Sequence, residues 1–290
     1  MTRSVFLDRD LPEAHTGAEV PVAPAVAHHI RVSRIGAGEE FDLVDGEGRR
    51  LTVVLAAPAA ADADGGVQPD GRPSRGRRRS RAEASPPLGV RVVDVSHEPV
   101  GAPELVLVQA LAKGDRDEQA VESATEIGVD RVVPWAAARS IAAWPAHKED
   151  RQTARWQALL ETATQQSRRA RAPRLEPLAR GTRVLDRLRD DDLVLVLHED
   201  ATDHLADLLA GTAPVAGAAP PSATAFARIV LVVGPEGGIA PDELKGFRTA
   251  GARSVLLGPT VLRASSAGPA GLALVQVALG RWRSAGAAGR

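Results

Sequence analysis

The sequence predicts an α/β protein in which a parallel sheet, covered by helices on both faces, follows a smaller β-rich domain. After about residue 100, apolar runs of strand length alternate with helical stretches, a pattern typical of parallel sheets. Before that point, short β-like segments are separated by turn residues. The 290 residues, 44% of them hydrophobic, are enough for two such domains, which we expect at 1–97 and 98–290.

Four short segments predict the β-rich domain, as a small barrel or sandwich: "HHIRVSRI", "EEFDLVDGEG", "LTVVL" and "GVRVVDV". Asp45-Gly46-Glu47-Gly48 has the composition of a hairpin turn between two of the strands. His28 and His29 would point to opposite sides of a strand, so they do not predict a shared metal ion.

Two segments have a composition that does not support a packed core. Residues 56–87 consist almost wholly of Ala, Asp, Gly, Pro, Ser and Arg, with Val67 as the one sizeable apolar side chain. Residues 212–225, "TAPVAGAAPPSATA", are similar. We expect a disordered, arginine-rich insertion at 56–87 and a flexible insertion at 212–225.

The second domain is predicted from its apolar runs and from the helical stretches between them. One helix is expected to begin at Asp115, with Glu118 completing a capping box, and to end at Gly128. Others should begin near Arg151 and near Ala267. The expected strands lie at 105–108, 131–135, 193–197, 229–233 and 255–257, and the expected core of the later helices includes Trp156, Leu159, Leu160, Ala163, Leu272, Val275 and Leu279.

The segment "LVVGPEGGIAPDEL", 231–244, predicts a buried strand, a tight glycine loop and a helix start with Pro241 in its first turn. Glycines allow positive φ and close approach of a ligand to the backbone, although a purely structural turn is the alternative. A dinucleotide-binding loop would follow the first strand of the sheet, and a phosphate loop would carry G-x-x-x-x-G-K-[ST]. This loop does neither, which argues against pyrophosphate binding.

Two more loops of similar character lie close by in the sequence. "LVLHED", 195–200, ends a buried strand in His198-Glu199-Asp200, and "LLGPTVLRASSAG", 256–268, follows the next strand after the glycine loop. In open α/β sheets, ligands bind beyond the carboxyl ends of the strands. The three loops therefore predict one shared pocket.

The charges favour an RNA partner over a membrane or a metal. Lysine occurs only at 113, 148 and 245, so most basic residues are arginines, which bind phosphates and stack on bases. Biased genomic composition is the alternative explanation, but the dense clusters at 72–81 and 165–174 support RNA binding. There is no cysteine, no signal-peptide pattern and no apolar stretch near the ~20 residues of a membrane helix. We expect a cytoplasmic protein without a metal site.

The motifs "VVGPEGG" and "LLGPTVLR" with a final helix resemble the SPOUT class of S-adenosylmethionine-dependent RNA methyltransferases, whose C-terminal segment forms a deep trefoil knot. Within that class, the chain is similar to the RsmE family, on "HHIRVSRIGAGEEFDLVDGEG", "QALAKGDRDEQAVESATEIGVDRVVPWAAARS" and "RWQALLETATQQSRRARAPRL". The resemblance implies a PUA-like RNA-binding barrel before the knotted domain, a homodimer, and methylation of N3 of a uridine in 16S ribosomal RNA of the small ribosomal subunit. Another RNA position, such as a ribose 2′-hydroxyl, and a non-catalytic RNA-binding protein are the alternatives.

The resemblance also implies a set of site residues. Arg263 is the candidate catalytic residue, as a guanidinium that stabilises charge on uracil; an ordinary salt bridge at a helix start is the alternative. For Glu236, ordering its own turn is a strong alternative to a ligand contact. The cofactor-binding candidates are His198, Glu199, Val233, Gly234, Pro235, Glu236, Gly237, Gly238, Leu257, Gly258, Leu262, Ser265 and Ala267. The RNA-binding candidates are His29, Arg31, Arg34, Arg139, Gln166, Arg169 and Arg171.

Two departures from the family pattern limit this transfer of roles. The family's Glu-Gln-Ser-Gly-Arg is Gln165-Gln166-Ser167-Arg168-Arg169 in this chain. The family's Thr-Glu-Thr-Ala is replaced by Ala264-Ser265-Ser266-Ala267, so a carboxylate that could accept a proton is missing there. The sequence therefore leaves the proton acceptor unassigned.

Overall fold

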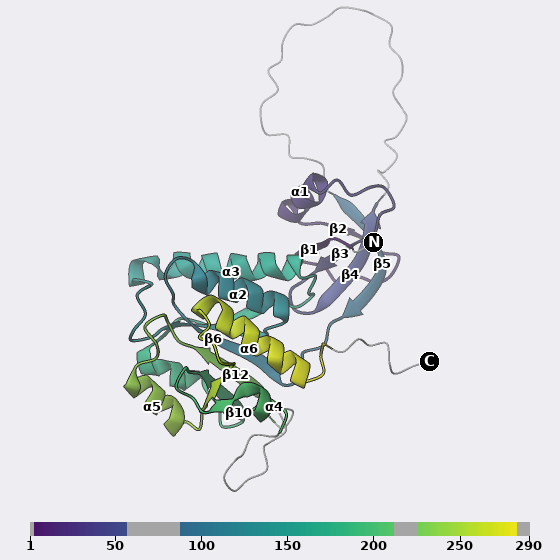
Figure 1. Cartoon of the computed structure of the whole chain (residues 1–290). Coiled ribbons are helices and arrows are strands. Elements are labelled where there is room, and N and C mark those ends of the chain that lie inside the picture. Colours follow the sequence, from purple (N-terminus) through teal and green to yellow (C-terminus); the bar gives the residue numbers. More distant parts are fainter. Residues whose placement is uncertain (1–2, 57–87, 212–225, 283–290) are drawn as a thin grey trace, which may run out of the picture. The chain divides into compact units, whose positions relative to one another are not determined.

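The computed structural model describes residues 3–56, 88–211 and 226–282 (Figure 1). The chain divides into two compact units, one formed by residues 1–45 and 49–97 and the other by residues 46–48 and 98–290. The insertions predicted at 56–87 and 212–225 lie outside the described residues, apart from Ala56.

The first unit contains a five-stranded sheet in the order β1-β3-β4-β5-β2. The turn predicted at residues 45–48 joins two antiparallel strands, as expected. Phe6 and Phe41 meet edge to face in the core, with ring centroids 5.8 Å apart. The strands are β1 (Val5–Leu7), β2 (Glu19–Pro21), β3 (Phe41–Val44), β4 (Arg49–Leu55) and β5 (Gly89–His97).

The strand predicted from "HHIRVSRI", 28–35, is wrong, because residues 28–32 belong to helix α1 (Pro24–Val32) and the rest forms the turn after it. Pro24 suits the first turn of a helix, and Val26, Ala27 and Ile30 form one buried face at helical spacing. The alternating apolar residues within the segment therefore came from helical rather than strand periodicity. His28 and His29 both lie exposed on this helix instead of pointing to opposite sides of a strand.

The second unit contains an eight-stranded sheet in the order β11-β13-β10-β12-β6-β7-β8, with β9 also paired to β7. All of these pairs are parallel, as the apolar runs predicted. The strands are β6 (Glu104–Ala110), β7 (Arg131–Ala136), β8 (Arg174–Leu175), β9 (Ala179–Arg180), β10 (Asp192–Leu197), β11 (Asp203–His204), β12 (Arg228–Val233) and β13 (Arg253–Leu256).

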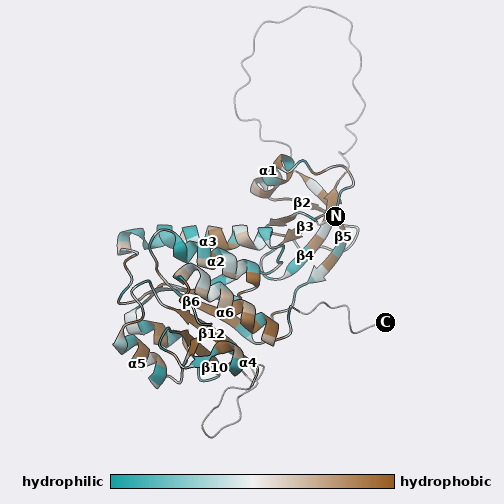
Figure 2. Cartoon of the chain, in the orientation of Figure 1, coloured by the Kyte–Doolittle hydropathy of each residue, from teal (hydrophilic) through white to brown (hydrophobic). Residues whose placement is uncertain are grey.

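Helices cover both faces of this sheet (Figure 1). On one face, α2, α3 and α6 pack on residues such as Leu105 and Leu107, and on the other, α5 and the 3₁₀ helix η2 pack on Val106 and Val108. The strands are coloured toward the hydrophobic end of the scale in Figure 2, as a doubly covered sheet requires. The helices are α2 (Arg116–Ile127), η1 (Ala146–Lys148), α3 (Glu149–Gln166), η2 (Gly181–Arg187), α4 (Leu205–Leu209), α5 (Pro241–Thr249) and α6 (Ala264–Ala278).

The ends of α2 agree only in part with the sequence prediction. Gly128 ends the helix at φ 109°, a conformation that favours glycine. Asp115 is the N-cap residue, as predicted, but the predicted capping box is wrong, because the Asp115 side chain makes no cap hydrogen bond and its φ is 56°. Instead, Asp117 accepts a hydrogen bond from Ala112 N–H at 3.1 Å. A neighbouring carboxylate thus holds the loop before α2.

The apolar stripe of α6 belongs to the core of this unit. Leu272 and Val275 are fully buried, so they are not available to a second copy of the chain. None of the described helices is long and apolar enough to span a membrane.

Candidate active site

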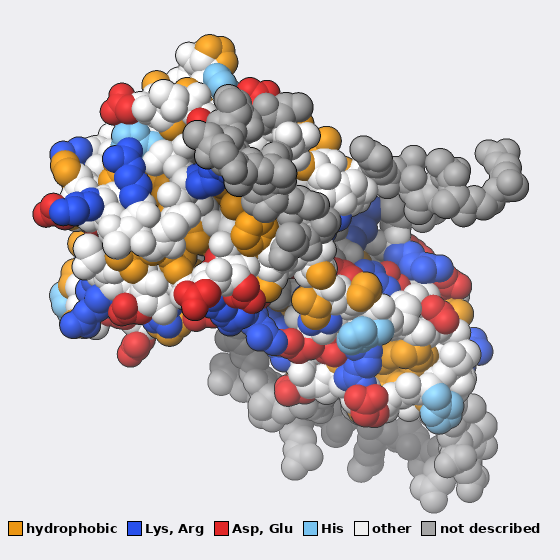
Figure 3. Space-filling model, turned by 90° about the horizontal axis from the view of Figure 1, so that it is seen from below, with side chains coloured by type: hydrophobic (Ala, Val, Ile, Leu, Met, Phe, Trp, Pro, Cys, Tyr) orange, Lys and Arg blue, Asp and Glu red, His pale blue; other side chains and the backbone are white. Residues whose placement is uncertain are grey.

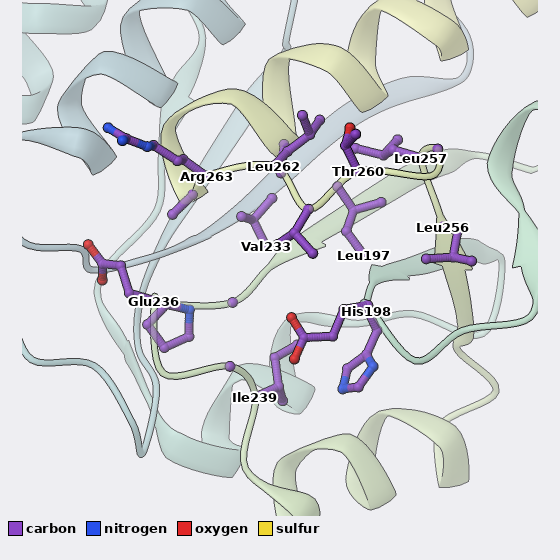
Figure 4. Close-up of a pocket in the computed structure, with 18 of the residues that line it drawn as sticks. Leu197, His198, Val233, Glu236, Ile239, Leu256, Leu257, Thr260, Leu262 and Arg263 are labelled. Carbon is purple, nitrogen blue, oxygen red and sulfur yellow. The ribbon is translucent and has the colours of Figure 1, made fainter.

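Three loops at the carboxyl ends of neighbouring strands enclose a pocket of about 370 Å³ in the second unit (Figure 4). They follow β10, β12 and β13, which lie side by side in the sheet. The parallel direction of these strands brings their carboxyl ends to one edge. The predicted convergence of the three loops is therefore present in the structure.

Most of the predicted cofactor residues line this pocket, together with Arg263. Gly237 and Ser265 are the two that do not. The sequence prediction missed one charged lining residue, Arg116, which lies at the start of α2. The other lining residues are uncharged, and all but Thr260 are apolar: Leu197, Ile239, Val255, Leu256, Pro259, Thr260, Val261 and Ala264.

The loop between β12 and α5, residues 234–240, is held by contacts on its outer side. A β-carbon on Gly234 would lie 2.7 Å from Cγ1 of Ile239, so the loop folds tightly on itself there. A β-carbon on Gly237 would lie 3.2 Å from Cβ and O of Arg139, and the Arg139 guanidinium donates to Gly237 O at 3.2 Å. Of the three loop glycines, Gly238 alone has a positive φ, 74°. The expected close approach of a ligand at Gly237 is therefore replaced by a protein contact.

Helix α5 anchors the same loop through the buried side chain of Glu243. Its two carboxylate oxygens accept from Ala138 N–H at 2.8 Å and from Ala240 N–H at 3.2 Å. Both acceptors lie in the first turn of the helix, where a negative charge is stabilised by the helix dipole. One carboxylate therefore ties the glycine loop to the segment that follows β7.

Glu236 has contacts on the side of the pocket that faces α2. Its Oε1 accepts from Lys113 N–H and from the Arg116 guanidinium, both at 3.1 Å. Partial burial acts to raise the pKa of Glu236, but hydrogen bonds from its own N–H, from Lys113 and from Arg116 outweigh burial and lower the pKa. The carboxylate is therefore charged at neutral pH, and it orders two loops rather than one turn.

The loop between β13 and α6, residues 257–263, is far more open. A β-carbon on Gly258 would meet no protein atom within 4 Å. Val261 is 79% exposed and Leu262 is 39% exposed. The backbone of this loop is thus open to a ligand in the pocket.

Arg263 is the N-cap residue of α6, and its side chain is exposed. Its guanidinium has no ion-pair partner within the part of the chain that the structure describes. Figure 4 shows its side chain extending toward the same side of the pocket as Glu236. An ordinary salt bridge at a helix start therefore does not account for this residue.

His198 is oriented by the chain turn that follows it. Its Nδ1 accepts a hydrogen bond from Asp200 N–H at 3.1 Å. In the neutral imidazole this leaves the proton on Nε2, which can then act as a donor. His198 is suited to hold an acceptor group of a ligand rather than to remove a proton.

The RNA-binding candidates fall into two groups. Five of them are exposed, whereas Arg169 is mostly buried and donates to Thr125 O at 2.9 Å and Val129 O at 2.7 Å. Arg171 likewise donates to Glu98 O at 3.0 Å. The exposed candidates are His29, Arg31, Arg34, Arg139 and Gln166.

The family departure at Arg168 has a structural consequence. Arg168 has a φ of 59°, a left-handed conformation in which glycine is favoured. A non-glycine residue there costs about 1 kcal/mol of backbone strain.

On the face shown in Figure 3, basic and acidic side chains are interspersed, without one continuous basic surface.

Comparisons with known proteins agree on one family. The family model of the RNA methyltransferase domain matches residues 100–276. Ribosomal RNA small subunit methyltransferase E of Mycobacterium bovis is 37% identical over 287 residues, which cover 97% of this chain and 94% of that protein. The protein of the same name from Bacillus subtilis is 27% identical over 164 residues, covering 57% of this chain and 62% of that protein.

Solved structures show the same fold at lower identity. The Neisseria gonorrhoeae ribosomal RNA small subunit methyltransferase E bound to S-adenosyl methionine superimposes with a TM-score of 0.72, at 22% identity over 95% of this chain and 98% of that one. A putative methyltransferase from Legionella pneumophila, also with bound S-adenosyl methionine, gives 0.69 at 22% identity, covering 95% and 97%. On the strength of the domain match and the 37% identity along the whole chain, this protein belongs to the RNA methyltransferase family that contains ribosomal RNA small subunit methyltransferase E.

Proposed function

We propose that this chain transfers the methyl group of S-adenosylmethionine to N3 of a uridine in 16S ribosomal RNA of the small subunit. The observation that carries the proposal is the pocket formed by three adjacent strand-end loops. The family supplies the reaction class, and the names of the relatives supply the substrate.

The pocket suits a molecule with flat apolar and charged parts. Leu197, Val233 and Leu257 provide apolar surface, and the open backbone at Gly258 provides N–H and C=O groups for a base edge. The charged ends of a methionine moiety would find donors in His198 and acceptors in Glu199. These residues, with the β12–α5 loop, would hold S-adenosylmethionine.

Bound S-adenosylmethionine supplies an electrophilic methyl carbon on a sulfonium. The chain's part is to align N3 of the base with that carbon, and such positioning accounts for much of the rate. N3 must lose its proton, which leaves negative charge on the ring and its carbonyl oxygens. The guanidinium of Arg263, without a protein partner among the described residues, would stabilise that charge as it forms.

We extend the proposal to the architecture around the site. The first unit, with its exposed His29, Arg31 and Arg34, would act as a PUA-like RNA-binding barrel. The C-terminal segment would form the trefoil knot, and two chains would form a homodimer in the cytoplasm. Light scattering on the 30.3 kDa chain tests the dimer, since a monomer at micromolar concentration would contradict it.

The test of function is to incubate the protein with S-adenosylmethionine and small ribosomal subunits from cells that lack the gene. Mapping the modified nucleotide by mass spectrometry should give one methylated uracil, with the methyl group on N3. Arg263→Ala serves as a control that retains the pocket. A methyl group on a ribose 2′-oxygen, or binding of RNA without any transfer, would contradict the proposed reaction.

A further inference from the structure

One ion pair at the pocket joins segments that lie far apart in the sequence. Glu236, in the β12–α5 loop, accepts from the backbone of the segment that links β6 to α2 and from the side chain of the first residue of α2. The segment that links β6 to α2 contains Gly114 and Asp115, both at positive φ, 68° and 56°. A non-glycine residue in this conformation is strained, and such strain persists only where surrounding contacts hold it. Glu236 is one of those contacts.

Arg116 occupies an electrostatically costly position. It is the first residue of α2, where the helix dipole disfavours a positive charge. Its side chain is 39% exposed, it lines the pocket, and Glu236 is its one ion-pair partner among the described residues. A guanidinium has five N–H donors, and Glu236 takes one of them at Nη1. Several donors therefore stay available to a ligand on the pocket side.

The surroundings of Arg116 favour an anionic ligand. Arg263 lines the same pocket and, as the N-cap of α6, also sits at the positive end of a helix. Figure 4 places the Arg263 side chain and Glu236 toward one side of the pocket. Two guanidinium groups at this side, with Glu236 partly neutralising one of them, form a local excess of positive charge. Arginine recognises phosphate oxygens through paired N–H donors.

We propose that Arg116 binds a backbone phosphate of the RNA next to the target base, and that Glu236 is a positioning residue that directs its guanidinium. This inference rests on the proposed function and adds the point at which the RNA strand is fixed. The carboxylate of the cofactor's methionine moiety is the alternative anion that Arg116 could bind. RNA phosphate is favoured because the Arg116 side chain, 39% exposed, remains open to solvent, as contact with a large polymer requires.

The experiment compares Arg116→Gln, Arg116→Lys and Glu236→Gln with a matched control, Arg155→Gln. Arg155 pairs with Asp115 and Glu118 beside the same helix start and is 53% exposed, but it does not line the pocket. Deproteinised 16S ribosomal RNA is titrated at several salt concentrations, and S-adenosylmethionine affinity is measured by calorimetry. Thermal unfolding of each variant verifies its fold.

Arg116→Gln should weaken RNA binding about 10-fold and reduce the slope of log affinity against log salt by about 1, with cofactor affinity unchanged. Arg116→Lys should recover part of the RNA affinity, since lysine retains the positive charge but not the paired N–H donors of the planar guanidinium. Glu236→Gln should weaken RNA binding less, because its oxygen still accepts from Lys113 N–H. The double variant, with both Arg116→Gln and Glu236→Gln, should bind RNA no more weakly than Arg116→Gln alone, as expected if Glu236 acts through Arg116.

Two results would overturn the inference. Loss of cofactor affinity in Arg116→Gln with intact RNA binding would assign the anion to the cofactor. RNA affinity and salt slope equal to those of Arg155→Gln would make Arg116 purely structural. A wild-type protein that binds the RNA without methylating it would instead refute the proposed function, and the same titrations would still measure the contact of Arg116.

Discussion

Two loops of the same pocket, each following a parallel strand and each containing a glycine, are built in opposite ways. Residues 234–240 are tied to the protein by Glu236, by Glu243 and by the contact between Gly237 and Arg139. Residues 257–263 expose Val261 and leave the space around Gly258 empty. Glycines of the first loop pack against the protein, whereas the glycine of the second loop faces open space.

This difference teaches that a glycine-rich turn does not by itself locate a ligand. In sequence the β12–α5 loop has the more conspicuous pattern, with three glycines in five residues. In the structure that loop is fixed by protein contacts, whereas the plainer β13–α6 loop, which ends at the proposed catalytic residue Arg263, has the more open backbone. Substitutions in the β13–α6 loop should therefore change methylation rate or cofactor affinity, whereas those in the β12–α5 loop should mainly change the free energy of unfolding.

The largest effect is expected at Arg263, in the open loop. Its guanidinium would interact more strongly with the transition state than with bound RNA, so its loss should appear in the rate. Arg263→Ala should lower single-turnover methylation on the order of 100- to 1000-fold, and Arg263→Lys should recover part of that loss. Calorimetry should give near wild-type affinity for S-adenosylmethionine. Activity restored by excess cofactor would show that Arg263 only shapes the loop.

Gly258→Val is expected to have the next largest effect. The new side chain would meet no protein atom near its β-carbon, and the backbone there is not at positive φ, so the fold should be unaffected. The branched side chain would project into space that a ligand needs. Cofactor affinity should fall about 10- to 100-fold, or ~1.4 to 2.8 kcal/mol. Wild-type affinity in the folded variant would exclude Gly258 from the cofactor site.

Gly237→Val is the counterpart in the fixed loop. Its β-carbon would lie 3.2 Å from Cβ and O of Arg139, closer than ordinary contact distance, so Arg139 or the loop must move slightly. Denaturant unfolding should give a loss of about 1 to 2 kcal/mol in stability. Cofactor affinity should fall less than in Gly258→Val. The reverse order of the two affinities would show that the ligand depends more on the β12–α5 loop than on the β13–α6 loop.

The parallel sheet could be predicted from the sequence because a strand buried on both faces needs a continuous apolar run. All five runs became strands, and the three loops that follow β10, β12 and β13 meet as parallel topology requires. Helix α1 was not predicted, since a short segment that buries Val26, Ala27 and Ile30 on one face also resembles an alternating strand. A short segment has too few residues to distinguish the 3.6-residue period of a helix from the two-residue period of a strand.

The partners of the site residues could not be predicted, because they depend on contacts between distant segments. Glu236 meets Lys113 and Arg116, more than 100 positions earlier, and no local pattern encodes that pairing. Arg169 belongs to an arginine-rich cluster that suggested RNA binding, yet its guanidinium is used by backbone carbonyls of its own unit. The position of Arg116 immediately after a strand-end loop was the one signal that could have included it in the site.

The smallest effect is expected at Val261, an exposed apolar residue of the open loop. Since its side chain is 79% exposed, Val261→Ser should change the free energy of unfolding by less than about 0.5 kcal/mol. The same substitution at Val255, fully buried in β13 just before the loop, should cost about 2 kcal/mol or more, because it creates a cavity and buries a hydroxyl. Denaturant unfolding at two protein concentrations measures both variants. A cost above about 1 kcal/mol at Val261 that grows with protein concentration would mean that a second copy of the chain covers this loop. The β13–α6 loop would then be an interface as well as a ligand site, and the contrast with the β12–α5 loop would hold only for the isolated chain.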